Sequence, residues 1–119
     1  MRLCIYMEIM EIDRLSKEIQ LLHQQVCPAL GDPKRMLILY LLDDGMKCVN
    51  DLAQSLEVPQ STVSRHLRVL REHGLVRTER QGTSVVYSLA NERIIQALEL
   101  LRQVMSEQIK DRLTQANLT

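Results

Sequence analysis

The sequence predicts a mainly α-helical domain that carries one small β-hairpin, and three observations lead to this expectation. The chain has no Trp or Phe, so Leu, Ile, Val and Met must build the core, a composition that favours helices. Apolar residues recur at helical spacing over most of the chain, whereas residues 75–89 are typical of two short strands. With 119 residues, 45% of them hydrophobic, residues 1–119 are expected to form a single domain.

The first expected helix runs from about Met7 to Val26. The segment "CPALGDP" then interrupts the helical pattern, so Cys27 should lie at the end of this helix. Five apolar residues follow one another at spacings of three and four, which is typical of a helix that packs along another helix. They are Ile12, Leu15, Ile19, Leu22 and Val26.

Three shorter helices are expected in the middle of the chain. Asp32 is a natural N-cap and Pro33 suits the first helical position, so a helix should begin there and end at Gly45. A second helix is expected from about Val49 to Leu56. The tight turn "EVP" then leads into a third helix, from about Gln60 to His73.

A hairpin and a long helix are expected to complete the domain. The turn of the hairpin falls at residues 81–83, where Gly82 permits a positive φ. The last helix should run from Asn91 to about Leu113. It carries more apolar surface than the edge of a small domain needs, which predicts a dimer interface shared with the first helix. Its stripe comprises Ile94, Leu98, Leu101, Met105 and Ile109, widened by Ala97, Leu100 and Val104.

Two short helices joined by a tight turn and followed by a hairpin make a winged helix-turn-helix. Residues 49–73 would form the helix-turn-helix and residues 75–89 the wing, with Val63, Leu67 and Leu70 facing the core. The rest of the second helix carries arginine, amide and hydroxyl groups, which suit base edges and phosphates of DNA. The predicted DNA contacts are Gln60, Ser61, Thr62, Ser64, Arg65 and Arg68, with Arg80 and Gln81 at the tip of the wing.

The distribution of charge favours DNA as the partner, although the net charge is zero. Residues 1–59 have a balance of −3, residues 60–84 a balance of +3, and residues 60–71 contain no acidic side chain. An ordinary solvated helix would alternate the sign of its charges. A winged helix that binds protein is the alternative from another class, but it has no reason to keep an acid-free face.

The stretches "LGDPKRMLILYLLDDG" and "CVNDLAQSLEVPQSTVSRHLRVLREHGLVRTERQGTSVVYSL" resemble the ArsR/SmtB family of bacterial metal- and redox-responsive repressors, from about Ala29 to Leu89. The resemblance implies an α-α-α-α-β-β-α homodimer that binds double-stranded operator DNA. Residues 1–27 and 91–119 would supply the dimerisation helices. One departure is Pro59, which stands where the family often has a capping Ser. The family's contacts carry over onto Gln60, Ser61, Ser64 and Arg65.

The resemblance also implies positions where an effector would act. A zinc-type site across the paired last helices needs Asp, His, His and Glu. The corresponding residues here are Asn91, Arg93, Val104 and Glu107. Arg93 cannot ligate a metal and Val104 has no donor atom, so we expect this site to be absent.

A thiolate site is the second possibility, because arsenic-, cadmium- and lead-responsive relatives carry Cys-Val-Cys at the third helix. Here Cys48 is kept and the second cysteine is replaced by Asn50. Soft ions such as As(III) or Cd(II) need further sulfurs, so Cys27 and Cys4 are also candidate ligands, within one chain or across the dimer. The predicted function is therefore a repressor that a thiol-reactive effector releases from DNA.

Other uses of the cysteines stay open. The family's dithiol switch needs cysteines in the second and last helices, which this chain lacks, but a redox pair of Cys27 with Cys48 is a further possibility. A repressor without any effector is another, in which the cysteines are structural. No cofactor is required by any of these alternatives.

Enzymatic and membrane functions are not expected. The sequence offers no catalytic triad, Gly-rich phosphate loop or paired-carboxylate cleft. The longest apolar run, residues 36–42, is too short to span a bilayer, and Glu8 and Glu11 come too early for a secretory signal. We therefore expect a cytoplasmic protein whose three cysteines are reduced.

Overall fold

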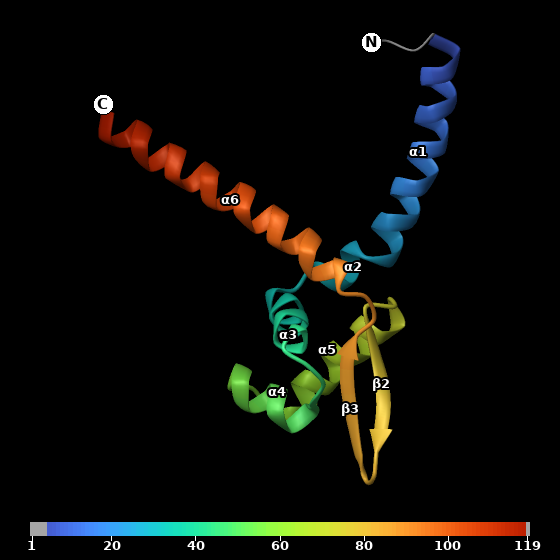
Figure 1. Cartoon of the computed structure of the whole chain (residues 1–119), viewed down its shortest axis with the longest axis vertical. Coiled ribbons are helices and arrows are strands. Elements are labelled where there is room, and N and C mark those ends of the chain that lie inside the picture. Colours follow the sequence, from blue (N-terminus) through green and yellow to red (C-terminus); the bar gives the residue numbers. More distant parts are fainter. Residues whose placement is uncertain (1–4, 119) are drawn as a thin grey trace.

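The computed structural model describes residues 5–118 and shows a small head from which two long helices diverge (Figure 1). The head contains the middle helices and the sheet, while the first and last helices leave it at the same end. The elements in chain order are α1 (Ile5–Gln25), α2 (Cys27–Leu30), α3 (Pro33–Asp43), β1 (Lys47–Cys48), α4 (Val49–Leu56), α5 (Gln60–Glu72), β2 (Val76–Gln81), β3 (Ser84–Leu89) and α6 (Arg93–Leu118).

The core of the head confirms the predicted inward face of α5. Val63, Leu67 and Leu70 are fully buried, and Leu52 and Ala53 of α4 are buried beside them. Full burial of an aliphatic side chain stabilises a fold by about 1.5–3 kcal/mol, so these side chains hold α5 firmly against the head. The remaining buried residues are Ala29, Ile38, Leu39, Leu42, Leu75, Val76, Ile95 and Leu98.

The sheet has three antiparallel strands in the order β1-β3-β2, one strand more than the sequence predicted. The expected hairpin is present: Gln81 pairs with Ser84 across the turn, and Gly82 has a φ of 64°. The additional strand, β1, pairs Lys47 with Tyr87 and Cys48 with Val86. A strand of two residues is too short to show any alternation of apolar and polar residues, so sequence periodicity could not predict it.

The break after the first helix differs from the prediction that Cys27 ends it. Helix α1 ends at Gln25, and Cys27 instead begins the short helix α2. Pro28 explains the break, because proline lacks the N–H that a continuing helix needs. In the first turn of a new helix the same proline is well tolerated.

The caps that position the helix-turn-helix agree with the sequence. Asp32 caps α3, where its Oδ1 accepts a hydrogen bond from the backbone N–H of Lys34 at 2.8 Å. In the turn between α4 and α5, Glu57 adopts the left-handed conformation with a φ of 56°. Helix α5 begins after Pro59 and has no side-chain cap, so the change from serine to proline leaves the helix start intact.

Helices α1 and α6 leave much of their apolar surface uncovered in a single chain. Leu15 and Ile19 of α1 are 54% and 51% exposed, and Leu101 and Met105 of α6 are 63% and 56% exposed. The radius of gyration is 19.0 Å, against about 13–14 Å for a compact chain of this length. Helix α6 also continues to Leu118, beyond the predicted end at Leu113. No helix in residues 5–118 is long and apolar enough to cross a membrane.

Candidate nucleic-acid interface

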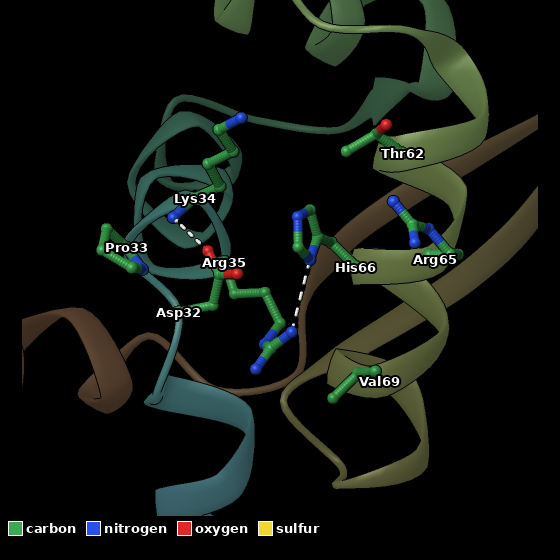
Figure 2. A pocket seen from close by; sticks show the side chains of 8 residues that line it. All are labelled: Asp32, Pro33, Lys34, Arg35, Thr62, Arg65, His66 and Val69. Atoms are coloured by element: carbon green, nitrogen blue, oxygen red, sulfur yellow. Dashed lines mark hydrogen bonds between the residues drawn. The ribbon is translucent and has the colours of Figure 1, made fainter.

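Helix α5 presents a polar face on the side opposite its buried residues. Gln60, Ser61, Ser64, Arg65 and Arg68 are all exposed, and at 3.6 residues per turn they lie within an arc of about 140°. The structure therefore brings these predicted DNA contacts together on one face. Thr62, which is half-buried, lies beside this face on the flank that turns toward α3 (Figure 2).

The start of α5 is fixed to the first turn of α4. The side-chain amide of Gln60 donates a hydrogen bond from Nε2 to Oδ1 of Asn50 at 2.9 Å. Within residues 5–118 the Oε1 atom of Gln60 has no hydrogen-bond partner, so it can accept one from outside the domain. The hydrogen bond between Gln60 and Asn50 links the first turn of α4 to the first residue of α5.

The predicted wing residues lie at the far end of the hairpin, beyond the body of the head (Figure 1). Arg80 and Gln81 are both exposed at the end of β2. The amide of Gln81 lies 3.7 Å from the sulfur of Met46, which links the hairpin tip to the segment before β1. The structure thus separates the wing tip from the polar face of α5, as two contact points on a long ligand require.

Arg35 joins three helices, a role that sequence reasoning missed. Its guanidinium donates from Nε to the carbonyl of Ala29 at 2.6 Å and from Nη2 to that of Pro28 at 3.0 Å. Its Nη1 lies 3.3 Å from Nδ1 of His66 on α5 (Figure 2). Because guanidinium has only donors, His66 must accept at Nδ1 and is therefore neutral. In the sequence, the segment "DPKR" indicates the cap of α3, but it gives no sign that Arg35 connects α3 to α2 and α5.

Burial lowers the pKa of His66 below its usual value of 6.5. Arg35, Arg65 and Lys34 lower it further by repulsion, and Asp32 opposes them. Below pH 6.5 the unfolded chain binds a proton at this position that the folded chain does not, so the protonated imidazole favours unfolding. The stability that the neutral ring provides is thus present above pH 6.5 and is lost as the pH falls through the folded pKa.

We expect the His66→Asn variant to be less sensitive to acid than the parent protein. The asparagine oxygen can accept the hydrogen bond from Arg35 and does not titrate in this range. Urea unfolding from neutral to mildly acidic pH measures the free energy of unfolding of both proteins. His23 and His73 are present in both, so the difference between the two proteins reports on His66. Equal losses of stability in the two proteins would show that His66 does not titrate as described.

Cys27 and Cys48 lie in different parts of the head. Cys48 ends β1 and occupies the N-cap of α4, half-buried and without a side-chain capping hydrogen bond. Cys27 is exposed at the start of α2 and lines an apolar cavity of about 460 Å³ between α1, α2 and α6. Cys4 lies outside the described residues. In the described part of the chain, no three His, Cys, Asp or Glu side chains are grouped to hold a metal ion.

Asn91 and Val104, two of the four positions of the zinc-type site, lie at the start of α6 and on its apolar side. Asn91 uses its Oδ1 to accept a hydrogen bond from the backbone N–H of Arg93 at 2.9 Å, at the start of α6. Val104 is 49% exposed on the apolar side of the same helix. Asn91 thus has a structural role in starting α6.

The chain belongs to the arsR family of bacterial regulatory proteins, whose family model matches residues 32–78. It is 33% identical over 81 residues to an HTH-type transcriptional regulator of Methanocaldococcus jannaschii, an alignment that covers 67% of this chain and 91% of that protein. It is 37% identical over 84 residues to the arsenical resistance operon repressor of Bacillus subtilis, covering 70% and 80%. It is 36% identical over 76 residues to the transcriptional activator HlyU of Vibrio cholerae, covering 64% and 70%.

Solved structures confirm the winged helix-turn-helix fold. A homodimeric winged helix-turn-helix DNA-binding domain from Mycobacterium bovis superposes with a TM-score of 0.72 at 29% identity, over 83% of this chain and 91% of that one. The cadmium metal-sensor CMTR of Mycobacterium tuberculosis superposes with a TM-score of 0.59 at 40% identity, over 69% and 85%. The mycobacterial regulators NmtR and SmtB are matched over 59% and 49% of their length. The family assignment from the sequence is confirmed, and the chain is a regulatory protein rather than an enzyme.

Proposed function

We propose that this protein is a homodimeric transcriptional repressor that binds operator DNA through α5 and releases it when a thiol-reactive effector acts at Cys48. The two recognition helices of the dimer enter successive major grooves, so the half-sites of the operator lie about 10 bp apart, centre to centre. The wing tips at Arg80 and Gln81 contact the DNA beside each half-site.

The division of α5 into two faces supports DNA as the ligand. Three fully buried residues fix the helix, while the opposite face offers arginine, amide and hydroxyl groups, with no carboxylate from Gln60 to Arg71. Arginine pairs with guanine through two hydrogen bonds, and exposed hydroxyls suit phosphate oxygens. A protein-binding winged helix would gain nothing from excluding acidic residues over residues 60–71.

The uncovered faces of α1 and α6 support the homodimer. In one chain these faces leave Leu15, Ile19, Leu101 and Met105 more than half exposed, which is costly for an isolated protein in water. A second copy supplies an identical pair of faces, as a two-fold symmetric interface requires. The Mycobacterium bovis relative, which is described as homodimeric, has the same fold.

The hydrogen bond between Asn50 and Gln60 carries the effector part of the proposal. Cys48 occupies the N-cap position of α4 and Asn50 lies in the first turn of that helix. Asn50 accepts a hydrogen bond from Gln60 at the start of the recognition helix. A new bond at the Cys48 sulfur therefore forms two residues away from Asn50, which contacts the start of the DNA-reading helix. An effector that binds the DNA-free geometry better than the DNA-bound geometry shifts the equilibrium toward release.

The chemistry of Cys48 suits a thiophilic effector. Its thiol is half-buried and is not used as a helix cap, so it can form a bond without breaking a hydrogen bond of the fold. As(III) and Cd(II) favour several thiolates, and the further sulfurs would come from Cys27, from Cys4 or from the partner subunit. Two relatives are described as an arsenical resistance operon repressor and as a cadmium metal-sensor.

We expect Cys48→Ser to bind operator DNA normally but to remain bound when As(III) or Cd(II) is added. The parent protein should lose operator affinity while ultraviolet sulfur-to-metal absorption rises in parallel. Cys27→Ser and Cys4→Ser, compared side by side, identify the additional ligands, and an added oxidant tests the redox alternative. If Cys48→Ser responds to each addition as the parent does, the effector does not act at α4.

A further inference from the structure

A cationic cleft lies between the start of α3 and the flank of α5 (Figure 2). It is an open hollow of about 600 Å³. Asp32, Lys34 and Arg35 line it from α3 and its cap, while Thr62, Arg65 and His66 line it from α5. The cleft therefore lies between two elements that the core holds in fixed positions.

The charge of the cleft is positive at neutral pH. Lys34, Arg35 and Arg65 are cationic, and His66 is neutral because burial and its cationic neighbours lower its pKa. Asp32 is the single acid that lines the cleft, and a hydrogen bond from the backbone N–H of Lys34 lowers its pKa, so it is ionised. Three positive charges and one negative charge favour an anionic ligand.

Two of the three cations are free to meet that ligand. The N–H donors of Arg35 already contact α2 and His66. The side chains of Lys34 and Arg65 make no hydrogen bond or ion pair with any residue in the described part of the chain. Lys34 can therefore approach a phosphate oxygen without first breaking an internal contact, and Arg65 adds positive charge to the opposite wall of the cleft while it stays available for a base.

The cleft adjoins the face of α5 that is assigned to DNA. Thr62 and Arg65 belong to the predicted DNA contacts and also line the cleft. A helix in the major groove, which is about 12 Å wide, has a phosphate backbone on each side. The backbone on the α3 side of α5 therefore passes the mouth of this cleft.

We propose that this cleft binds a phosphate group of the operator backbone, with Lys34 as its main ligand and the Thr62 hydroxyl as a further donor. The proposal rests on the proposed function and adds to it a third contact region, besides the α5 face and the wing. It assigns Lys34 a sequence-independent role, because a phosphate carries no base identity.

The test compares Lys34→Ala with the parent protein on two duplexes, an operator selected from random DNA and an unrelated sequence of equal length. We expect Lys34→Ala to weaken binding to both duplexes by the same factor. The slope of log affinity against log salt concentration should become shallower by about 2 per dimer, since each lost phosphate contact contributes about 0.9. Alanine keeps the backbone N–H that Asp32 accepts from, so the cap of α3 survives, and thermal melting checks the fold.

The matched control is Lys17→Ala. Lys17 lies on α1, pairs with Asp13 at 3.5 Å and is remote from the cleft, so its loss should change neither affinity nor slope. Equal slopes for Lys34→Ala and the parent would overturn the proposal. If the parent protein binds neither duplex at low salt, the proposed function fails together with the cleft.

A second measurement separates DNA phosphate from a free anion. Inorganic phosphate is titrated into the DNA-free protein while the ring resonances of His66 are followed by NMR, with chloride at equal ionic strength as the reference. Suppose that Lys34→Ala no longer responds to phosphate but binds both duplexes as the parent does. The cleft would then be a site for a small anion, and its assignment to DNA would be overturned. Loss of affinity for both duplexes supports it.

Discussion

The Leu101→Glu variant is expected to be monomeric and to lose specific binding to the operator. Leu101 lies in the middle of the apolar stripe of α6 and is 63% exposed in one chain, so in the dimer a carboxylate there would be buried without a partner. The substitution occurs twice in a symmetric interface, which doubles its effect. Because the two half-sites are then bound independently, the gain from linking them is lost, a factor of about 10²–10⁴ in affinity.

Light scattering and fluorescence anisotropy with a labelled operator measure the two effects. The control is Gln103→Glu, which adds the same carboxylate on the opposite side of α6 and should leave the dimer intact. If Leu101→Glu stays dimeric at micromolar concentration, the association does not use the apolar stripe of α6.

The Arg65→Ala variant is expected to weaken operator binding by about 1–3 kcal/mol per half-site, because a bidentate pair between arginine and guanine is lost. The loss should be larger on the operator than on an unrelated duplex, since a base contact carries sequence information. Arg65 is exposed on the polar side of α5, so its removal should leave the free energy of unfolding nearly unchanged.

Arg80→Ala provides the comparison for Arg65→Ala. Arg80 is exposed at the end of β2, where the wing would approach the phosphate backbone. Its loss should weaken binding to both duplexes alike and reduce the salt dependence. Competition assays with the two duplexes separate these patterns, and normal operator binding by both variants would mean that the wrong face has been assigned to DNA.

Much of the fold follows from local signals in the sequence. The apolar spacing of Val63, Leu67 and Leu70 fixes which side of α5 is buried, and the exposed residues of its other side follow by geometry. Asp32 and Gly82 marked a cap and a turn because each residue type suits a particular backbone conformation. These signals act over a few residues, so a single sequence is enough to interpret them.

Features that depend on contacts between distant segments could not be predicted in this way. Strand β1 exists because Lys47 and Cys48 pair with β3, about forty positions further along the chain. The first helix is divided near Pro28. Proline is known to interrupt a helix, but whether the chain then leaves the helical conformation or starts a new helix depends on packing. The sequence signal for a break was present, and only the assignment of Cys27 to the wrong helix failed.

The cleft and the Arg35 bridge were missed for the same reason. Lys34 and Arg35 lie in the first turn of α3, where a basic residue looks like ordinary helix surface. Their roles emerge only because α3 packs across α5, which brings His66, thirty-one residues away, to within 3.3 Å of Arg35. The three candidate cysteines share no recognised ligand spacing, and whether they meet in the dimer depends on how the two copies dock.

Binding to DNA of varied half-site spacing tests the claim that a dimer places its two α5 helices in successive major grooves of one duplex. The selected operator is compared with a version in which about 5 bp, half a helical turn, are inserted between the half-sites. A dimer that places α5 in successive major grooves should bind the selected operator with two chains per duplex, lose affinity as salt increases, and bind the altered duplex only as weakly as unrelated DNA. Equal binding of the two duplexes, or no binding of either at low salt, would contradict the claim.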